Sequence, residues 1–225
     1  MKDIYLYVLC EGESEMQLVK TTLHPYLESM AKDIHLIIKR INLKGRINWD
    51  KIRKDLNNAN QIANREHQKA YFTTMIDFYA LPTDFPGNEG AKDRNHKGVV
   101  TSIEKAMSEM GKVDNFIPYV QLHEFEALVF CDIDLLTEHF ELSEKARESL
   151  EKIVKDFHRN PEDINRKPST APSKRLDKAF QEDGKRKYPK VLVAGEIPQI
   201  IGIPKFKEMC PHFAEWVSKL ECLVR

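Results

Sequence analysis

The stretch Ile4–Glu15, IYLYVLCEGESE, decides the fold of the first half of the chain. Its first seven residues are apolar and β-prone and run directly into Glu11, so the pattern predicts a buried first strand over Ile4–Cys10. Ser14 and Gln17 have the spacing of a capping box with Ser14 as the N-cap residue, which predicts the start of a helix. A strand followed by a helix is the first half of a βαβ unit.

The same alternation continues to the middle of the chain. Pro25 falls inside the first helical pattern and is expected to kink or split that helix. Further strands are predicted over Ile34–Ile41, Tyr71–Ile76 and Phe116–Leu122, further helices over Trp49–His67 and Val99–Met110, and a helix start over His123–Phe130. Strands that alternate with helices imply a mainly parallel sheet flanked by helices, so the predicted class is α/β. Residues 78–95 form a long proline- and glycine-containing loop, a kind that is often functional.

The second part of the chain has a different pattern. Helices are predicted over Leu142–Phe157 and Phe213–Leu223, with a loop over Pro161–Pro172 and a broken segment over Pro198–Pro211. We therefore expect an α/β core over residues 1–135 and a mainly helical C-terminal extension over residues 136–225. The two are expected to pack together as one compact unit.

Composition excludes several classes of protein. Apolar residues make up 41% and charged residues 31% of the chain, and no apolar run is long enough to span a bilayer. The N-terminus lacks the small-residue cleavage site of a signal peptide. The four cysteines are scattered, which favours buried free thiols over a zinc or redox site. We expect a cytoplasmic protein with no membrane partner.

The formal net charge of zero hides two segments of opposite sign. Residues 121–151 contain nine acids and two bases, whereas residues 158–190 contain ten Lys and Arg against five acids. Such segregation would place a basic wall beside an acidic metal site, so zero net charge is compatible with a polyanionic substrate. Two solvated surfaces would give the same counts, and charge alone leaves both interpretations open.

Acidic residues recur where the predicted strands end. Glu11 ends the first strand, Asp77 ends the third, and His123, Glu124 and Glu126 follow the fourth. Because the carboxyl ends of parallel strands meet at one edge of a sheet, these side chains are expected to lie close together. Neighbouring carboxylates repel one another unless a cation neutralises them, and Mg²⁺ prefers such oxygens. The pattern predicts a Mg²⁺ or Mn²⁺ site, where the cation would activate water.

Each of these acids also has a structural interpretation. Glu11 before a glycine is a common loop acid, and Asp77 is a usual turn starter before a proline-containing loop. Glu15 would lie in a first helical turn, where the helix dipole favours any carboxylate. His123 and Glu126 share one helical face, which suits metal binding or general-base chemistry as well as a plain polar helix start.

Two basic residues are the candidate phosphate ligands. Lys174 and Arg175 follow Ser173, which is placed to cap a helix, so both cations would lie in the first turn. Cations in that position oppose the helix dipole, which indicates a purpose other than helix stability. Binding a phosphate is one such purpose, and a solvated helix start is the other interpretation.

The acidic motifs carry a resemblance to a known fold. Glu11-Gly12-x-x-Glu15 after a strand resembles the EGxxE/D signature of Toprim domains, which occur in primases, topoisomerases and overcoming-lysogenization-defect nucleases. In that fold a Glu ends the first strand, a DxD motif ends a later one, and both bind Mg²⁺. Asp77 occupies the first DxD position, but Tyr79 replaces the second acid. The resemblance then assigns the missing oxygen to another acid: Glu15, Glu124 or Glu126.

Over its whole length the chain resembles a Toprim-like bacterial family of unknown function, domain-of-unknown-function family 4276, which is related to the overcoming-lysogenization-defect nucleases. The most specific stretch is HEFEAL at residues 123–128. The other matching stretches are the EGxxE motif, Asp77–Pro82, Asn160–Asn165, Pro172–Arg175 and Cys210–Phe213.

This resemblance implies a divalent-metal-dependent nuclease that acts in phage defence with an ATPase partner and takes nucleic acid, DNA included, as its substrate. The chain has no P-loop signature, so any use of ATP would come from the partner. Whether the protein forms a homo-oligomer stays open. The residues expected to be catalytic are Glu11, Asp77, His123, Glu124 and Lys174. The expected metal ligands are Glu11, Glu15, Asp77, Glu124 and Glu126. Lys174 and Arg175 are expected to bind phosphate, and Tyr79 and Glu162 are expected to line the site.

Two other hypotheses remain. In the first, Tyr79 marks a degenerate site, and the protein is a non-catalytic Toprim-like module that docks on a partner ATPase or on nucleic acid. In the second, the protein is a phosphohydrolase for small molecules. A haloacid-dehalogenase-type phosphatase needs an acid two residues after its nucleophilic Asp, where this chain has Tyr79.

Overall fold

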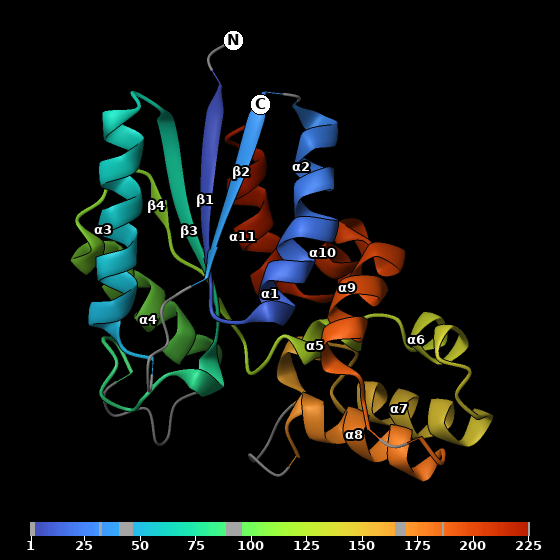
Figure 1. Ribbon diagram of the computed structural model, residues 1–225. Coiled ribbons are helices and arrows are strands. Elements are labelled where there is room, and N and C mark those ends of the chain that lie inside the picture. The colour runs from blue at the N-terminus through green and yellow to red at the C-terminus, as the bar shows by residue number, and fades with distance from the viewer. Residues whose placement is uncertain are drawn as a thin grey trace.

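The computed structural model describes residues 3–31, 33–40, 47–88, 96–164, 170–185 and 187–224. Its centre is a parallel sheet in the order β2-β1-β3-β4, with β5 also paired to β3 (Figure 1). The strands are β1 (Ile4–Cys10), β2 (Ile34–Arg40), β3 (Lys69–Asp77), β4 (Phe116–Ile117) and β5 (Val120–Gln121). The predicted α/β class and parallel sheet are confirmed. Ile41 and residues 89–95 of the predicted loop lie outside the described residues.

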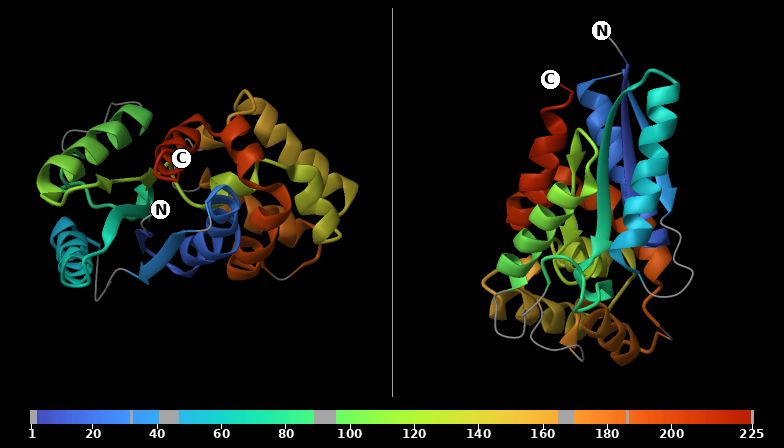
Figure 2. Two further views of the ribbon diagram at one scale, coloured as in Figure 1. Left: turned by 90° about the horizontal axis from the view of Figure 1, so that it is seen from above. Right: turned by 90° about the vertical axis from the view of Figure 1, so that its left-hand side faces the viewer.

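Strand β1 is buried on both faces of the sheet. Successive side chains of a strand point to opposite sides, so β1 contributes to two hydrophobic cores. Leu6, Val8 and Cys10 belong to one core, and Tyr7 and Leu9 belong to the other. A run that is apolar at nearly every position therefore requires helices on both faces of the sheet (Figure 2).

The helices form two layers and an additional group. One face of the sheet is covered by α3 (Trp49–Arg65) and α4 (His96–Gly111). The opposite face is covered by α1 (Glu13–Leu18), the π-helical η1 (Val19–Leu23), α2 (His24–Met30) and α11 (Pro211–Glu221), and α9 (Lys190–Ile201) and α10 (Ile203–Met209) pack against these helices. Beyond the carboxyl ends of the strands lie α5 (Glu126–Val129), α6 (Ile133–His139), α7 (Glu144–Asp156) and α8 (Pro172–Glu182) (Figure 1). The predicted division at residue 135 stays a prediction.

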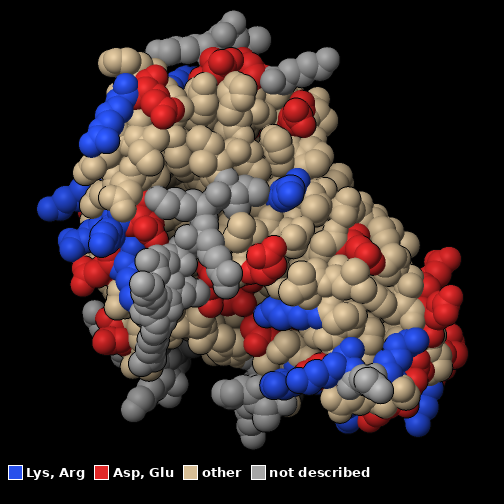
Figure 3. Space-filling model, in the orientation of Figure 1, with Lys and Arg blue, Asp and Glu red and all other residues tan. Residues whose placement is uncertain are grey.

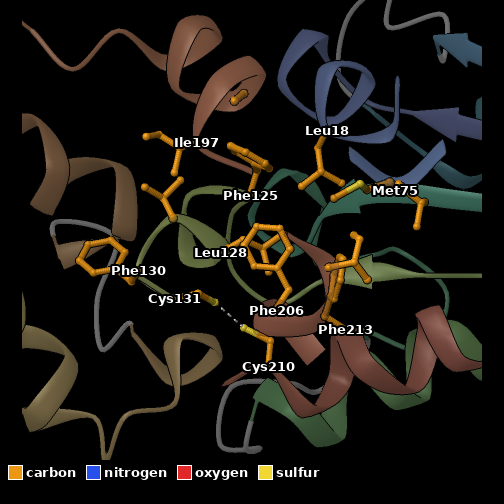
Figure 4. Packing of buried hydrophobic residues seen from close by; sticks show 14 of the residues in the cluster. Leu18, Met75, Phe125, Leu128, Phe130, Cys131, Ile197, Phe206, Cys210 and Phe213 are labelled. Carbon is orange, nitrogen blue, oxygen red and sulfur yellow. Dashed lines mark hydrogen bonds between the residues drawn. The ribbon is translucent and has the colours of Figure 1, made fainter. Parts of the chain in front are cut away.

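One hydrophobic cluster joins the sheet to the C-terminal helices. This cluster contains Phe125, Leu18 of α1, Met75 of β3 and Phe213 of α11 (Figure 4). Cys131 and Cys210 lie in the same cluster with their sulfur atoms 3.4 Å apart. All four cysteines are free thiols, as predicted, although Cys222 is exposed. Within the described ranges, no helix has the length and apolar character needed to cross a membrane.

The first helix begins two residues earlier than predicted. Gly12 is the N-cap residue, and Ser14 is buried inside the first turn. The predicted capping box is therefore wrong, and the Gln17 amide instead donates to Glu13 Oε1 at 3.0 Å. The expected disturbance at Pro25 is confirmed, because the π-helical η1 directly precedes the helix that contains it. Proline has no N–H to continue the α-helical hydrogen bonding.

The C-terminal prolines allow more helix than expected. Pro198 lies inside α9, and Gly202 with φ of 82° separates α9 from α10. Glycine adopts this left-handed backbone without the steric cost of a Cβ atom. Pro204 and Pro211 lie in the first turns of α10 and α11, where a missing N–H costs no helical hydrogen bond. The expected broken segment is thus two helices joined at a glycine.

The fourth predicted strand is divided into β4 and β5 at Pro118. Proline cannot donate to the ladder, and a side chain of β3 restores the connection. The Thr74 hydroxyl accepts from Tyr119 N and donates to Tyr119 O, both at 2.9 Å. This exchange continues the pairing across the break and carries the chain to the edge of the sheet at His123.

Replacing Thr74 with valine is expected to lower the free energy of unfolding by about 1–3 kcal/mol. Valine has nearly the same shape but leaves the buried Tyr119 N–H and C=O without their partner, which costs their desolvation. Urea unfolding of the full chain measures the change. The control is Thr101→Val on the exposed surface of α4, which is expected to change stability by less than about 0.5 kcal/mol. Equal effects at the two positions would contradict the role given to Thr74.

Candidate functional site

Glu11 and Asp77 meet at the carboxyl edge of the sheet. Glu11 follows β1 and Asp77 is the last residue of β3, and these two strands are parallel neighbours. Glu11 Oε2 accepts a hydrogen bond from Asp77 N at 3.0 Å, although the residues are 66 positions apart. The two acids therefore lie at the same edge, as the strand-end pattern predicts.

Two further acids approach this edge from helices. Glu15 lies in the first turn of α1 and is buried, and a Cβ atom at Gly12 would come within 2.8 Å of its Oε2. Glu126 is the first residue of α5 and is completely buried. Asp77 Oδ1 accepts from Phe125 N at 2.9 Å, which joins the end of β3 to the residue before Glu126. We call Glu11, Glu15, Asp77 and Glu126 the carboxylate edge.

Burial and neighbouring acids raise pKa values at the carboxylate edge. Burial raises the pKa of Asp77 well above its usual range, and Glu15, Glu11 and Glu126 raise it further. Burial also raises the pKa of Glu11 to about 7, with a smaller contribution from Glu15, although the hydrogen bond from Asp77 N opposes the shift. The ionised edge therefore holds buried negative charge that attracts a cation.

Lys190, the first residue of α9, is a cation that the sequence analysis missed. Its Nζ lies 3.1 Å from Glu126 Oε1, and the Tyr188 hydroxyl donates to the same oxygen at 3.3 Å. Burial lowers the pKa of Lys190, but Glu126 and Asp77 outweigh that effect and raise it, so the ammonium stays charged. The only sequence signal was its place at the end of the basic segment, and nothing there indicated a contact with Glu126.

His123 lies beside the edge as a buried, neutral imidazole. It is 2% exposed, and burial, together with the neighbouring His96, lowers its pKa to about 4. Its Nδ1 and Glu126 Oε2 are buried without a hydrogen-bond partner in the described part of the chain. Sequence analysis missed His96, whose ring centroid is 4.9 Å from that of His123. An unpartnered imidazole nitrogen suits proton transfer or metal ligation.

Tyr79 contributes a ring where the resemblance expects an acid. It belongs to the 3₁₀ turn η2 (Phe78–Ala80), and its ring centroid is 5.5 Å from that of His123. Its N–H donates to His123 O at 3.2 Å. Burial and then Glu124 raise the pKa of Tyr79 to about 12, so the phenol stays neutral. Tyr79 therefore contacts His123 and brings no charge, and its site-lining role stays a prediction.

Glu124 and Glu162 hold the starts of two helices. Glu124 Oε2 accepts from Ser173 N at 3.0 Å in the first turn of α8. Glu162 lies in the 3₁₀ turn η4 (Pro161–Asp163), and its two oxygens accept from His212 N at 2.9 Å and Phe213 N at 2.8 Å at the start of α11. Carboxylates stabilise helix N-termini in this way. The catalytic and metal-binding roles of Glu124 and the site-lining role of Glu162 stay predictions.

The helix expected from His123 begins three residues later, at Glu126. His123 has a left-handed backbone with φ of 67°, which does not belong to a right-handed helix. Lys174 and Arg175 line a pocket between α7 and α8, and no acid of the carboxylate edge lines that pocket. Asn165 of the matching stretches lies outside the described residues.

The donors at the carboxylate edge fit a hard cation in their chemistry. Carboxylate oxygens are the ligands that Mg²⁺ and Mn²⁺ prefer, and Glu126 Oε2 is a buried acceptor without a donor in the described ranges. Among the described residues, no group of three or more His, Cys, Asp or Glu is already arranged to hold a metal ion. A bound cation would therefore require these side chains to shift.

A family model covers the carboxylate edge together with the helices around it. The model of a domain of unknown function, DUF4276, matches residues 10–221. The chain belongs to the DUF4276 family. A search of curated proteins gives no match to this DUF4276 chain. Among solved structures it is similar to the C-terminal region of the Xanthomonas campestris pv. campestris OLD protein, with 11% identity over 97% of this chain and 96% of that one. The TM-score of 0.33 is too low for this likeness to carry an argument.

Glu11→Gln is expected to raise the free energy of unfolding of the DUF4276 chain by about 2 kcal/mol at about pH 8, and to leave it nearly unchanged at about pH 4. Because the pKa of Glu11 rises from 4.5 to about 7 on folding, the folded state binds the proton more tightly. Stability from this group is therefore complete below pH 4.5 and is lost as the pH rises through 7. Glutamine removes that loss and can still accept from Asp77 N.

Urea unfolding in EDTA across this pH range measures the effect. The control is Glu13→Gln, which neutralises an exposed acid of the same motif and is expected to show no such pH dependence. A Glu11→Gln protein that is less stable than the parent at both ends of the pH range would contradict the assigned cost of burying the ionised carboxylate.

Proposed function

We propose that this DUF4276 protein is a Mg²⁺- or Mn²⁺-dependent nuclease that hydrolyses phosphodiester bonds at the carboxylate edge. The observation that carries the proposal is the meeting of Glu11 and Asp77, at the ends of adjacent parallel strands, with Glu15 and Glu126 of the neighbouring helices. Glu15, Glu11 and Glu126 raise the pKa of Asp77. Buried acids with this mutual repulsion are stabilised by a hard cation. Figure 3 shows acidic side chains gathered in the middle of one face of the molecule.

In this proposal Glu11, Asp77 and Glu126 would hold the cation, with Glu15 or Glu124 as a further oxygen ligand. The cation would supply a bound water of lowered pKa and stabilise the charge that develops on the phosphate. Glu11 and Asp77 each use one oxygen for a backbone N–H. These hydrogen bonds fix the two carboxylates relative to the sheet, which would limit the entropy lost when a ligand binds.

His123 is the proposed acceptor of the proton released by the attacking water. Its buried Nδ1 is unpartnered in the described part of the chain, and its ring is neutral at physiological pH. A pKa of about 4 makes it a weak base in the free protein, and an anionic phosphate nearby would raise that pKa. His96 lies against His123 and is partly exposed, so it would pass the proton on to solvent.

Lys190 would hold the negative charge of the phosphate in place. Its ammonium already lies beside Glu126 and stays charged despite partial burial. An ammonium near several carboxylates keeps the free site from carrying its full negative charge, which would otherwise repel a nucleic acid. We propose that the Lys190 ammonium contacts both Glu126 and a phosphate oxygen of the substrate.

The EGxxE motif at Glu11 and the position of Asp77 support a relation to Toprim nucleases of the overcoming-lysogenization-defect type. On this proposal the protein acts as a nuclease effector in phage defence, beside a partner that binds ATP. The sequence has no P-loop signature of its own, so ATP use would belong to the partner.

Asp77→Asn is expected to lower metal-dependent cleavage of a fluorescent DNA or RNA substrate by at least about 100-fold, because it removes a charged ligand of the cation. Cleavage is measured with Mg²⁺ and with Mn²⁺, and EDTA is expected to abolish it. The matched control, Glu13→Gln, removes one exposed acid of the same motif and is expected to keep full activity. Retained cleavage in a folded Asp77→Asn protein would reject the assignment.

The second candidate is a non-catalytic Toprim-like module that docks on an ATPase or on nucleic acid. The neutral Tyr79 in the position of the second DxD acid favours it. This alternative predicts that isothermal titration with Mn²⁺ detects no binding and that no substrate is cleaved. Mn²⁺ binding that is lost in Asp77→Asn would instead support the nuclease.

A further inference from the structure

A pocket with an excess of positive charge lies between α7 and α8. Its volume is about 370 Å³, and its charged lining consists of one acid, Asp156, and four cations. The cations are Lys152 of α7 and Lys174, Arg175 and Lys178 of α8. We call this feature the basic groove. It is separate from the carboxylate edge, because none of the four acids of that edge lines it.

The charge of the basic groove is not a general property of the helical group. A second pocket of similar volume, about 340 Å³, lies on the other side of α7, and its lining contains four acids and three basic residues. On that side Arg147 pairs with Glu144, Asp134 and Glu151, and Lys155 also pairs with Glu151. Two acids of α7, Glu144 and Glu151, therefore pair on the side away from the groove, and Asp156 is the one acid among the described residues that line the groove.

The lysines of the groove have weak ion pairs or none in the described ranges, and its arginine side chain is fixed by contacts. Lys152 and Lys174 make no ion pair within the described ranges, and Lys178 is 3.6 Å from the exposed Glu182, a weak surface pair. Arg175 is held in place, because its Nε donates to Thr170 O at 2.7 Å and its guanidinium lies over the Phe157 ring at 5.3 Å. A fixed guanidinium beside mobile ammonium groups is a suitable arrangement for phosphate oxygens.

The first turn of α8 connects the groove with the segment that leads into α5. Ser173 N in the first turn of α8 donates to Glu124 Oε2 at 3.0 Å, and Glu124 is two residues before Glu126. Lys174 follows Ser173 in the same turn, where a cation opposes the helix dipole and weakens the helix. Lys174 of the groove is therefore one residue from a backbone N–H that binds Glu124, close in sequence to Glu126.

We propose that the basic groove binds the phosphodiester backbone of a nucleic-acid strand and holds it on the flank of the carboxylate edge, an inference that rests on the proposed nuclease function for its choice of ligand. The contacts are to phosphate oxygens and carry no sequence preference. The edge has four acids against the ammonium of Lys190, so it attracts a polyanion weakly, and the groove supplies the affinity that the edge lacks.

The test measures binding apart from cleavage. A fluorescein-labelled oligonucleotide of roughly 20 nucleotides is titrated with the full chain in EDTA, and anisotropy gives Kd at several salt concentrations. The Lys152→Gln, Lys174→Gln double variant is expected to bind about tenfold more weakly, with a salt slope smaller by about 1 to 2. The control double variant, Lys54→Gln with Lys219→Gln, removes two exposed charges from α3 and α11. It is expected to change Kd less than about twofold.

Three outcomes would overturn the proposal: no binding by the parent chain, equal weakening in the two double variants, or displacement by poly-glutamate as effective per charge as by unlabelled oligonucleotide. The last outcome would assign the groove to an acidic protein partner. Asp77→Asn separates failure of the nuclease proposal from failure of this one. That variant is expected to lose cleavage and to bind the oligonucleotide through the groove with the Kd of the parent. A chain that binds through the groove but cleaves nothing with Mn²⁺ retains this inference and loses the nuclease.

Discussion

The buried negative charge at the ends of β1 and β3 is the constraint on which the rest of the site depends. Glu11 and Asp77 are held together by the hydrogen bond from Asp77 N to Glu11 Oε2, and the parallel pairing of β1 with β3 brings their backbones to the same edge. Burial raises both pKa values, and the nearby carboxylate of Glu11 raises that of Asp77 further. Such an arrangement is costly to stability. Because the fold keeps these carboxylates buried, binding of a cation or a proton at the edge would change the stability of the protein.

The C-terminal helices contribute to the charge balance and the geometry of the carboxylate edge. Lys190 of α9 provides the ammonium beside Glu126, and Glu162 fixes the start of α11 through two backbone N–H groups. The Trp216 indole of α11 donates to Thr73 Oγ1 of β3 at 2.8 Å, which ties the helix to the central sheet. The N-terminal half therefore supplies three of the four acids, and the part of the chain beyond residue 136 supplies the cation that offsets them.

Sequence could predict what depends on local pattern and failed where long-range contacts decide. The burial of β1 and the acids at the strand ends follow from apolar runs and from the rule that parallel strands end at one edge. Lys190 and His96 were missed, because their roles arise only when distant segments pack together. The cap at Ser14 failed because the helix already begins at Glu13, so Ser14 lies buried within its first turn.

The replacement of an acid by Tyr79 does not leave the edge short of charge. Asp77 Oδ1 accepts from Phe125 N, and this bond brings the start of α5 against the end of β3. Glu126 follows directly and adds a fourth carboxylate, one oxygen of which has no donor among the described residues. Tyr79 instead packs against His123 and shields its imidazole. The carboxylate edge thus holds four acids without an acid at position 79.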